Sequence, residues 1–292
     1  MSRGGGAGLS VGIGPTLRSM RYLISAILVI SSTMLSAAEP AAEPAPVRNA
    51  PAVRKPDATV PDTIAILTQH RPTSGDDKPG IFRMQGGGEV DLISIPHADD
   101  VIFGRADFWF PLAEGTVAIC VGAPVLRYQY SQNTDIGLGD LNLHADWVPK
   151  IDGPNGLLVS LDTTWDTANK DRLGIQQHTI APSAAYVIPL PSAFTFAPSI
   201  EHRNSWLRRG DESVSITNVH GYVTWLGHPK FWIIADPALN VDHHANRSWF
   251  SLDAEAGVQI SKPLSVYVRP GVATGDERPY DVHVAGGLSV TF

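Results

Sequence analysis

The sequence contains few charged residues and almost no cysteine. Only 17% of its 292 residues are Asp, Glu, Lys or Arg, whereas an average globular protein has about 25%. The formal net charge of -7 gives no basic surface of the kind that binds nucleic acid. The one cysteine, Cys120, cannot form an intramolecular disulfide. These shortages exclude a disulfide-stapled scaffold and a nucleic-acid-binding protein.

Long apolar runs are also missing from most of the chain. After residue 38 no segment offers about 20 uninterrupted apolar residues, which is the length that a membrane-spanning helix needs. The mean hydropathy of -0.02 resembles that of a soluble protein. A membrane β-barrel has the same average, because its strands alternate lipid-facing and lumen-facing residues. The sequence therefore excludes a helical membrane protein but not a barrel.

The first apolar run has the three parts of a secretory signal peptide. Arg18 and Arg21 precede the apolar segment 22–30, and small residues follow as far as Ala38. A charged region, a short apolar core and a small-residue cleavage site are typical of exported bacterial proteins. We predict cleavage after Ala38, with Met20 as an alternative start of the signal peptide, and export through the inner membrane.

Residues 39–80 are predicted to form a disordered periplasmic linker. Ala, Pro and Glu dominate its first part, and such a composition cannot bury a core. Residues 61–88 are ambiguous, since 63–67 could form a short strand or a plug turn. The Gly86–Gly88 triplet lacks the strand-then-helix context of a phosphate-binding loop, so no nucleotide site is expected.

From residue 81 to the end, the chain is predicted to be an all-β, antiparallel, up-and-down transmembrane barrel of about twelve strands. Segments of roughly ten residues, the length of a tilted membrane strand, alternate apolar and polar side chains. In the last segment Val284 and Leu288 lie on one face and His283 and Ser289 on the other. A terminal Phe292 could also fill a soluble sandwich core. The twelve segments are at roughly 89–96, 101–110, 116–128, 137–148, 156–166, 177–188, 193–204, 213–226, 231–242, 249–261, 264–273 and 281–292.

The connections between these segments alternate in length. Those at 112–115, 190–192, 227–230 and 261–263 are short and rich in Pro or Gly, whereas the intervening ones are longer and more polar. Outer-membrane barrels have short periplasmic turns and long external loops. Nothing in the architecture of a soluble sandwich requires short and long connections to alternate in this way. Tryptophans near strand ends suggest interfacial aromatic belts; these are Trp109, Trp147, Trp165, Trp225, Trp232 and Trp249.

An ordered series of motifs from about residue 101 to the end resembles a known family. The motifs are Gly137–Leu141, Asp162–Thr163, Ile180–Val187, Leu226–Pro237 and Val258–Pro263. They resemble the outer-membrane proteins assigned to the MetA pathway of phenol degradation, which are often called transporters. Residues 163–166 depart from the Pro-Thr-Gly or Pro-Thr-Ala usual there. The resemblance implies a barrel and the uptake of small compounds, with aromatic or hydrophobic ones among the candidates.

Charged residues of both signs are expected to face the lumen. Such groups can filter solutes in a pore, or they can neutralise one another in an ion-pair lattice that fills a narrow barrel. The residues expected to contact a solute are Arg105, Asp107, Arg127, Asp140, His144, Asp146, Asp162, Glu201, Arg203 and Arg269. No metal is predicted at His243 and His244, because adjacent strand residues point to opposite faces.

The sequence predicts an outer-membrane channel through which a small solute diffuses passively. One alternative is a structural or plugged barrel without transport. Another is a lipid hydrolase, which would need a rim serine beside a histidine base; no motif of that kind is present, so no enzyme is expected. The expected partners are outer-membrane lipid, the solute and the barrel-assembly machinery, which would recognise the last strand ending at Phe292. No cofactor is expected.

Overall fold

Antiparallel strands make up most of the structure, which is a computed structural model. It describes residues 60–70, 81–96, 101–129, 136–152, 155–170, 173–208, 213–275 and 278–292. All of them belong to one compact unit, Lys55–Phe292. The predicted signal peptide and most of the predicted linker lie outside these residues.

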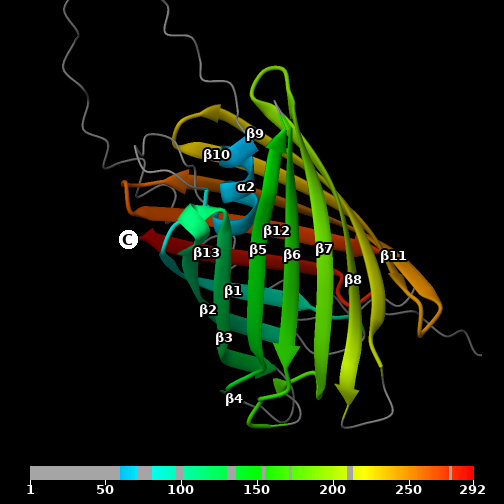
Figure 1. The fold of residues 1–292 in the computed structure, drawn as a ribbon. Coiled ribbons are helices and arrows are strands. Elements are labelled where there is room, and N and C mark those ends of the chain that lie inside the picture. Colours follow the sequence, from blue (N-terminus) through cyan, green and yellow to red (C-terminus); the bar gives the residue numbers. More distant parts are fainter. Residues whose placement is uncertain are drawn as a thin grey trace, which may run out of the picture. The chain divides into compact units, whose positions relative to one another are not determined.

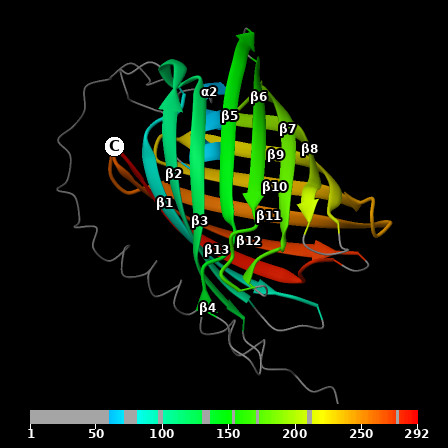
Figure 2. The same cartoon turned by 60° about the horizontal axis from the view of Figure 1, so that its bottom comes forward.

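Twelve long strands close into a barrel, as predicted (Figures 1 and 2). Closure is shown by β1, which pairs with both β2 and β13. The short β4 (Ile136–Gly137) pairs with β3. The long strands are β1 (Gln85–Ser94), β2 (Val101–Leu112), β3 (Val117–Gln129), β5 (Leu141–Asp152), β6 (Asn155–Trp165), β7 (Gln177–Leu190), β8 (Phe194–Arg208), β9 (Ser215–His228), β10 (Phe231–Asp242), β11 (Arg247–Gln259), β12 (Leu264–Thr274) and β13 (Val282–Thr291).

The alternation of side chains gives the barrel an apolar outer face and a more polar lumen. Leu288 is 49% exposed, whereas its neighbour Ser289 is 3% exposed. Large apolar side chains remain exposed all around the barrel, which suits a lipid-facing surface; among them are Val90, Phe108, Ile119, Leu161, Ile200, Val219, Leu239, Leu252 and Val272. The predicted facing of the last strand is therefore confirmed.

The two ends of the barrel differ in their connections. The end that carries the start of β1 and the end of β13 has short turns, including the 3-10 turn η1 (Ala113–Gly115) between β2 and β3. We call it the short-turn end. The opposite, long-loop end carries the longer connections, such as 166–176 between β6 and β7. This asymmetry, predicted from the sequence, is the one that outer-membrane barrels show.

A helix, α2 (Val60–Gln69), lies within the ring of strands near the short-turn end (Figure 1). Ile64, Ala65 and Ile66 are fully buried. Pro61 and Asp62 favour a helix start at this point, because proline fits the first turn and an acidic side chain complements the helix dipole. No helix among the described residues is long and apolar enough to cross a bilayer.

This helix corrects two sequence expectations. Residues 63–67 form neither a strand nor a turn, and residues 60–69 are not part of a disordered linker. The barrel wall begins with β1 at Gln85, four residues after the predicted boundary at 81. A ten-residue segment rich in apolar residues is too short for its sequence pattern to separate a helix from a strand.

The tryptophan prediction is wrong for three of the six residues. Trp109, Trp232 and Trp249 are at most 9% exposed and lie on the inward-facing positions of their strands. Trp147, which is 51% exposed, is on the outer face as a belt residue should be. A position near a strand end does not determine which face of the barrel a side chain lies on. Successive residues of a strand point to opposite faces, so the face alternates from one residue to the next.

Candidate functional site in the barrel lumen

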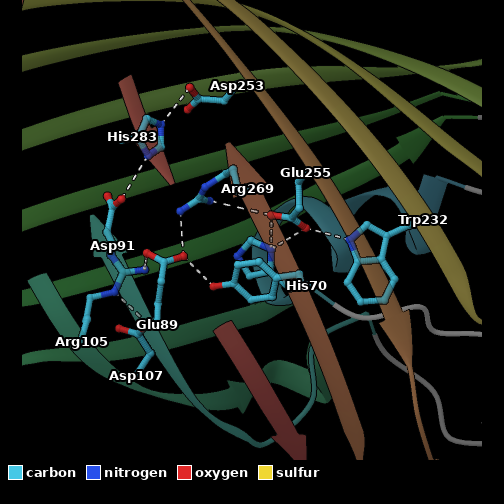
Figure 3. A network of polar contacts seen from close by, with 11 residues as sticks. His70, Glu89, Asp91, Arg105, Asp107, Trp232, Asp253, Glu255, Arg269 and His283 are labelled. Carbon is cyan, nitrogen blue, oxygen red and sulfur yellow. Dashed lines mark hydrogen bonds and ion pairs between the residues drawn. The ribbon is translucent and has the colours of Figure 1, made fainter. Parts of the chain in front are cut away.

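Glu89 on β1 is the centre of a polar network on the lumen wall (Figure 3). Its carboxylate accepts hydrogen bonds from the Tyr267 hydroxyl at 2.6 Å and from the Arg269 guanidinium at 2.7 Å. The Arg105 guanidinium lies 3.8 Å away and also donates to Asp107 at 2.8 Å. Glu89 is 7% exposed, and a carboxylate this buried requires such partners. The wall charges therefore neutralise one another, as the lattice hypothesis predicts.

Glu255 on β11 extends this network to α2. It accepts a hydrogen bond from the Trp232 indole N–H at 2.7 Å and contacts the imidazole of His70 at 3.0 Å. His70 also stacks on Tyr267, with ring centroids 4.3 Å apart. Arg269 lies 3.9 Å from Glu255 and so links it to Glu89. The network thus joins strands β1, β10, β11 and β12 to the helix.

His283 on β13 connects two carboxylates nearer the long-loop end (Figure 3). Its imidazole lies 3.2 Å from Asp91 on β1 and 3.0 Å from Asp253 on β11. It reaches Asp253 across β12 only because Gly271 stands between them, where a Cβ atom would lie 2.1 Å from both side chains. Outside the strands, burial and the Asp253 carboxylate raise the pKa of Tyr280 to about 12, so its neutral hydroxyl donates to Asp253 at 3.4 Å.

A second network lies on β5 and β6. His144 contacts Asp146 at 2.9 Å and Asp162 at 3.5 Å. Ser160 donates to Asp146 at 2.5 Å, and the Asn142 amide donates to both oxygens of Asp162. This part of the wall therefore repeats the pattern of one imidazole between two carboxylates.

A third group lies on β8, β9 and β10. Arg203 donates to Glu201 at 3.3 Å, and the Asn218 amide donates to the same carboxylate at 3.1 Å. His220 contacts Asp236 at 3.0 Å. Asp236 stands directly opposite Asp253 in the pairing of β10 with β11. Like charges so placed destabilise a sheet, which makes their histidine partners important for the wall.

The structure brings eight of the ten predicted site residues into these three networks. Arg105, Asp107 and Arg269 join the first, His144, Asp146 and Asp162 the second, and Glu201 and Arg203 the third. Arg127 lies on β3, and the position of its side chain is outside what the structure describes.

Asp140 has a different role from the one predicted. Its carboxylate accepts hydrogen bonds from the backbone N–H groups of Thr167, Ala168 and Ile175 at 2.6–3.0 Å. These residues belong to the long connection between β6 and β7, so Asp140 fixes a loop at the long-loop end instead of being available to a solute.

Several network residues were missing from the predicted site. Glu89, Asp91, Tyr267 and His283 lie on the polar-facing positions of strands β1, β12 and β13, so the alternation of their strands could have indicated them. His70 lies immediately after α2, and nothing in a strand pattern points to it.

Carboxylates outnumber guanidinium groups in the three networks. The carboxylates are Glu89, Asp91, Asp107, Asp146, Asp162, Glu201, Asp236, Asp253 and Glu255, and the guanidinium groups are Arg105, Arg203 and Arg269. Four histidines, His70, His144, His220 and His283, complete them. Even if all four imidazoles were protonated, these groups together would remain negative. In the described part of the chain, no three His, Cys, Asp or Glu side chains are grouped so that they could hold a metal ion.

Comparison with solved structures identifies the fold as that of outer-membrane channels. The COG4313 outer-membrane channel from Pseudomonas putida F1 has a TM-score of 0.59 and 10% sequence identity, with 75% of this chain and 100% of that chain covered. The KdgM porin is also similar, with a TM-score of 0.52 and 8% sequence identity over 71% of this chain and 99% of that chain. The NanC porin has a TM-score of 0.52 and 11% sequence identity over 72% of this chain and 98% of that chain. No protein-family model matches the sequence, and no curated protein matches it either.

Proposed function

We propose that this protein is an outer-membrane channel through which small polar solutes diffuse passively. The observation that carries the proposal is the exposure of charged side chains on the lumen wall toward the long-loop end. There the side chains of Asp253 and Arg203 are 25% and 38% exposed. Charged side chains inside a closed barrel keep such exposure only where the lumen admits water, because a dry core would leave them desolvated.

The likeness to solved structures supports the same class of protein. The similar structures are named as a channel and as porins. The resemblance of residues 101–292 to the MetA-pathway proteins agrees with this. Transport by a barrel of this kind requires no catalytic group.

The charge of the wall favours cationic solutes. Among the described side chains, the three networks hold nine carboxylates against three guanidinium groups and four histidines, so their summed charge is negative and favours cations over anions of similar size. Rings and rows of acidic side chains are the usual way in which pores select cations. We therefore infer that small organic cations pass more easily than matched anions.

A liposome-swelling assay tests the proposal. Purified protein in vesicles should let a small ammonium compound enter at least several times faster than an amino acid derivative that carries a net negative charge. Vesicles without protein are the control. No swelling with any solute would contradict the channel, whereas faster entry of the anion would contradict only the charge argument.

A structural barrel without transport is the second candidate. The specific observation in its favour is α2, whose buried Ile64 and Ile66 lie in the lumen near the short-turn end. Impermeable vesicles, together with envelope defects in cells that lack the protein, would favour this candidate.

Ser160, Ser251 and Ser289 lie on the lumen side of their strands, and their contacts give the hydrolase alternative no support. Ser160 donates to Asp146 rather than to His144, and Ser251 is hydrogen-bonded to Asn240. Ser289 Oγ is buried without a hydrogen-bond partner among the described residues. A nucleophilic serine needs a base at hydrogen-bond distance, and His283 is instead engaged by two carboxylates.

The location follows from the same proposal. We infer that residues 1–38 direct export, that the mature protein resides in the outer membrane, and that the assembly machinery recognises β13 with Phe292. Leu288 and Val290 on the apolar face of this strand supply the pattern. Fractionation of cells should place the protein with outer-membrane markers, and recovery from the periplasmic or cytosolic fraction would contradict the inference.

A further inference from the structure

We propose that α2 is a gate, which closes the short-turn end of the lumen when seated and opens it when it leaves. The proposal rests on the channel function above. The helix lies in a seat of inward-facing side chains contributed by strands on many sides of the barrel. The seat consists of Trp109, Val148, Leu158, Val187, Trp232 and Tyr267, of which Val187 and Trp232 are fully buried. A helix enclosed in this way leaves little room for a solute beside it.

Specific polar contacts hold the helix in its seat. Near its start, the Thr63 hydroxyl donates to the Thr195 hydroxyl on β8 at 2.9 Å. At its end, Gln69 exchanges hydrogen bonds with the backbone of Arg83 and accepts one from the Gln85 amide, and His70 contacts Glu255. These contacts define one closed position rather than a loosely packed plug.

Most contacts of the wall network join wall residues to one another and not to the helix. The helix can therefore leave its seat without breaking these contacts. The ion pairs of Glu89 with Arg269 and Arg105, and the bond from Trp232 to Glu255, all join wall residues to one another. Among the contacts drawn in Figure 3, only His70 comes from the helix segment. Departure of α2 therefore removes one partner of Glu255 and the ring that stacks on Tyr267, and it leaves the ion pairs between wall residues intact.

The closed state also buries polar atoms that the open state would hydrate. Thr224 is fully buried beside Thr195 in the pairing of β8 with β9, and its hydroxyl has no hydrogen-bond partner among the described residues. Gln85 Oε1, near the end of the helix, is in the same condition. An unpaired buried polar atom costs free energy. Water that enters an open lumen would hydrate these atoms, and the free energy gained would offset part of the cost of exposing apolar surface there.

A reversible cross-link between helix and wall tests the gate. The Thr63 and Thr195 hydroxyls lie 2.9 Å apart, so Thr63→Cys and Thr195→Cys place two thiols within reach of each other. Cys120 lies in the apolar cluster that surrounds Ile64, so the pair is introduced with Cys120→Ala to prevent mispairing. Conductance of this full-length variant is measured in planar bilayers, first oxidised and then after addition of a reductant to the same membrane.

We expect the oxidised form to conduct at least tenfold less than the reduced form. The two single-cysteine variants in the same background are the matched controls and should not respond to the reductant. In addition, Ile64→Asp should increase the open fraction, because it places a charge in the apolar seat. This second variant tests the gate without a disulfide.

The outcomes separate the gate from the channel. Equal currents before and after reduction, with the disulfide verified by mass spectrometry, would overturn the gate and leave the channel standing. An absence of current in every form, Ile64→Asp included, would overturn both proposals. A higher current in the oxidised form would also overturn the gate, because it would mean that the seated helix supports conduction.

Discussion

Glu89 is a wall carboxylate on which three side chains converge. Its carboxylate binds Tyr267 and Arg269 and faces Arg105. Glu89→Gln keeps the shape but removes the charge, which leaves the Arg269 guanidinium, 26% exposed, without its closest partner. Because removal of one member of a buried ion pair is strongly destabilising, we expect the free energy of unfolding to fall by about 3 kcal/mol.

Urea unfolding in lipid vesicles, followed by the heat-dependent shift of the folded band on gels, measures this loss. Glu114→Gln in the exposed turn η1 is the matched control and should change stability by less than about 0.5 kcal/mol. Equal stability of the two variants would show that the Glu89 network is not structural.

The facing of individual residues can be tested by two neighbours on β11. Leu252 is 41% exposed on the outer face, and Ser251 lies on the lumen side. We expect Leu252→Arg to cost about 2–4 kcal/mol, because the bilayer interior disfavours a charge, and Ser251→Arg to cost much less. Folding yield in vesicles is the measurement. A larger loss for Ser251→Arg would reverse the assignment of the two faces.

For individual residues, the sequence predicts the face of the sheet on which a side chain lies better than it predicts the side chains that it contacts. Strand alternation correctly predicted that His283 and Ser289 share the polar face of β13. It could not predict that His283 meets Asp253 across Gly271, because that contact depends on the register of three strands. Asp140 was assigned to the solute path for the same reason, since only the fold brings the backbone of 167–175 to it.

At the scale of elements, glycines in the strands shape the seat of α2. Trp232 on β10 pairs with Gly257 on β11, and a Cβ atom at Gly257 would lie 2.0 Å from the indole ring. Tyr267 covers Gly287 on β13 in the same way. Both aromatic side chains lie flat on the wall only because these positions lack side chains, which leaves space for the helix.

Gly257→Ala should therefore displace Trp232 and destabilise the protein by about 1–3 kcal/mol, the usual cost of forcing extra volume into a packed interior. Gly286→Ala is the matched control, because its Cβ would meet no atom closer than 3.8 Å and alanine suits a strand better than glycine does. Thermal unfolding of the two variants in the same detergent gives the comparison. Equal midpoints would show that the indole does not need this glycine.

The elements themselves were largely predictable, apart from α2. All twelve long strands fall within a few residues of the predicted segments, since each had to satisfy lipid on one side and the lumen on the other. The helix has no such two-sided environment. Its Ile64 and Ile66 are buried by strands distant in sequence, so its position could be found only from the fold.

At the scale of the whole molecule, a closed barrel satisfies the backbone hydrogen bonds of every spanning strand, and its inner wall carries the three polar networks. The described side chains of these networks are negative in sum, which distinguishes this wall from a neutral one. This negative sum also sets the sign of the ion current that the protein should carry, whichever solute it serves.

The reversal potential of the purified protein in a planar bilayer tests this account most directly. Under a tenfold gradient of potassium chloride, we expect the potential to have the sign of a cation-selective pore, and Asp236→Asn with Asp253→Asn to move it toward zero. Membranes that carry no current in any variant, or a reversal potential of the anion-selective sign, would contradict the account.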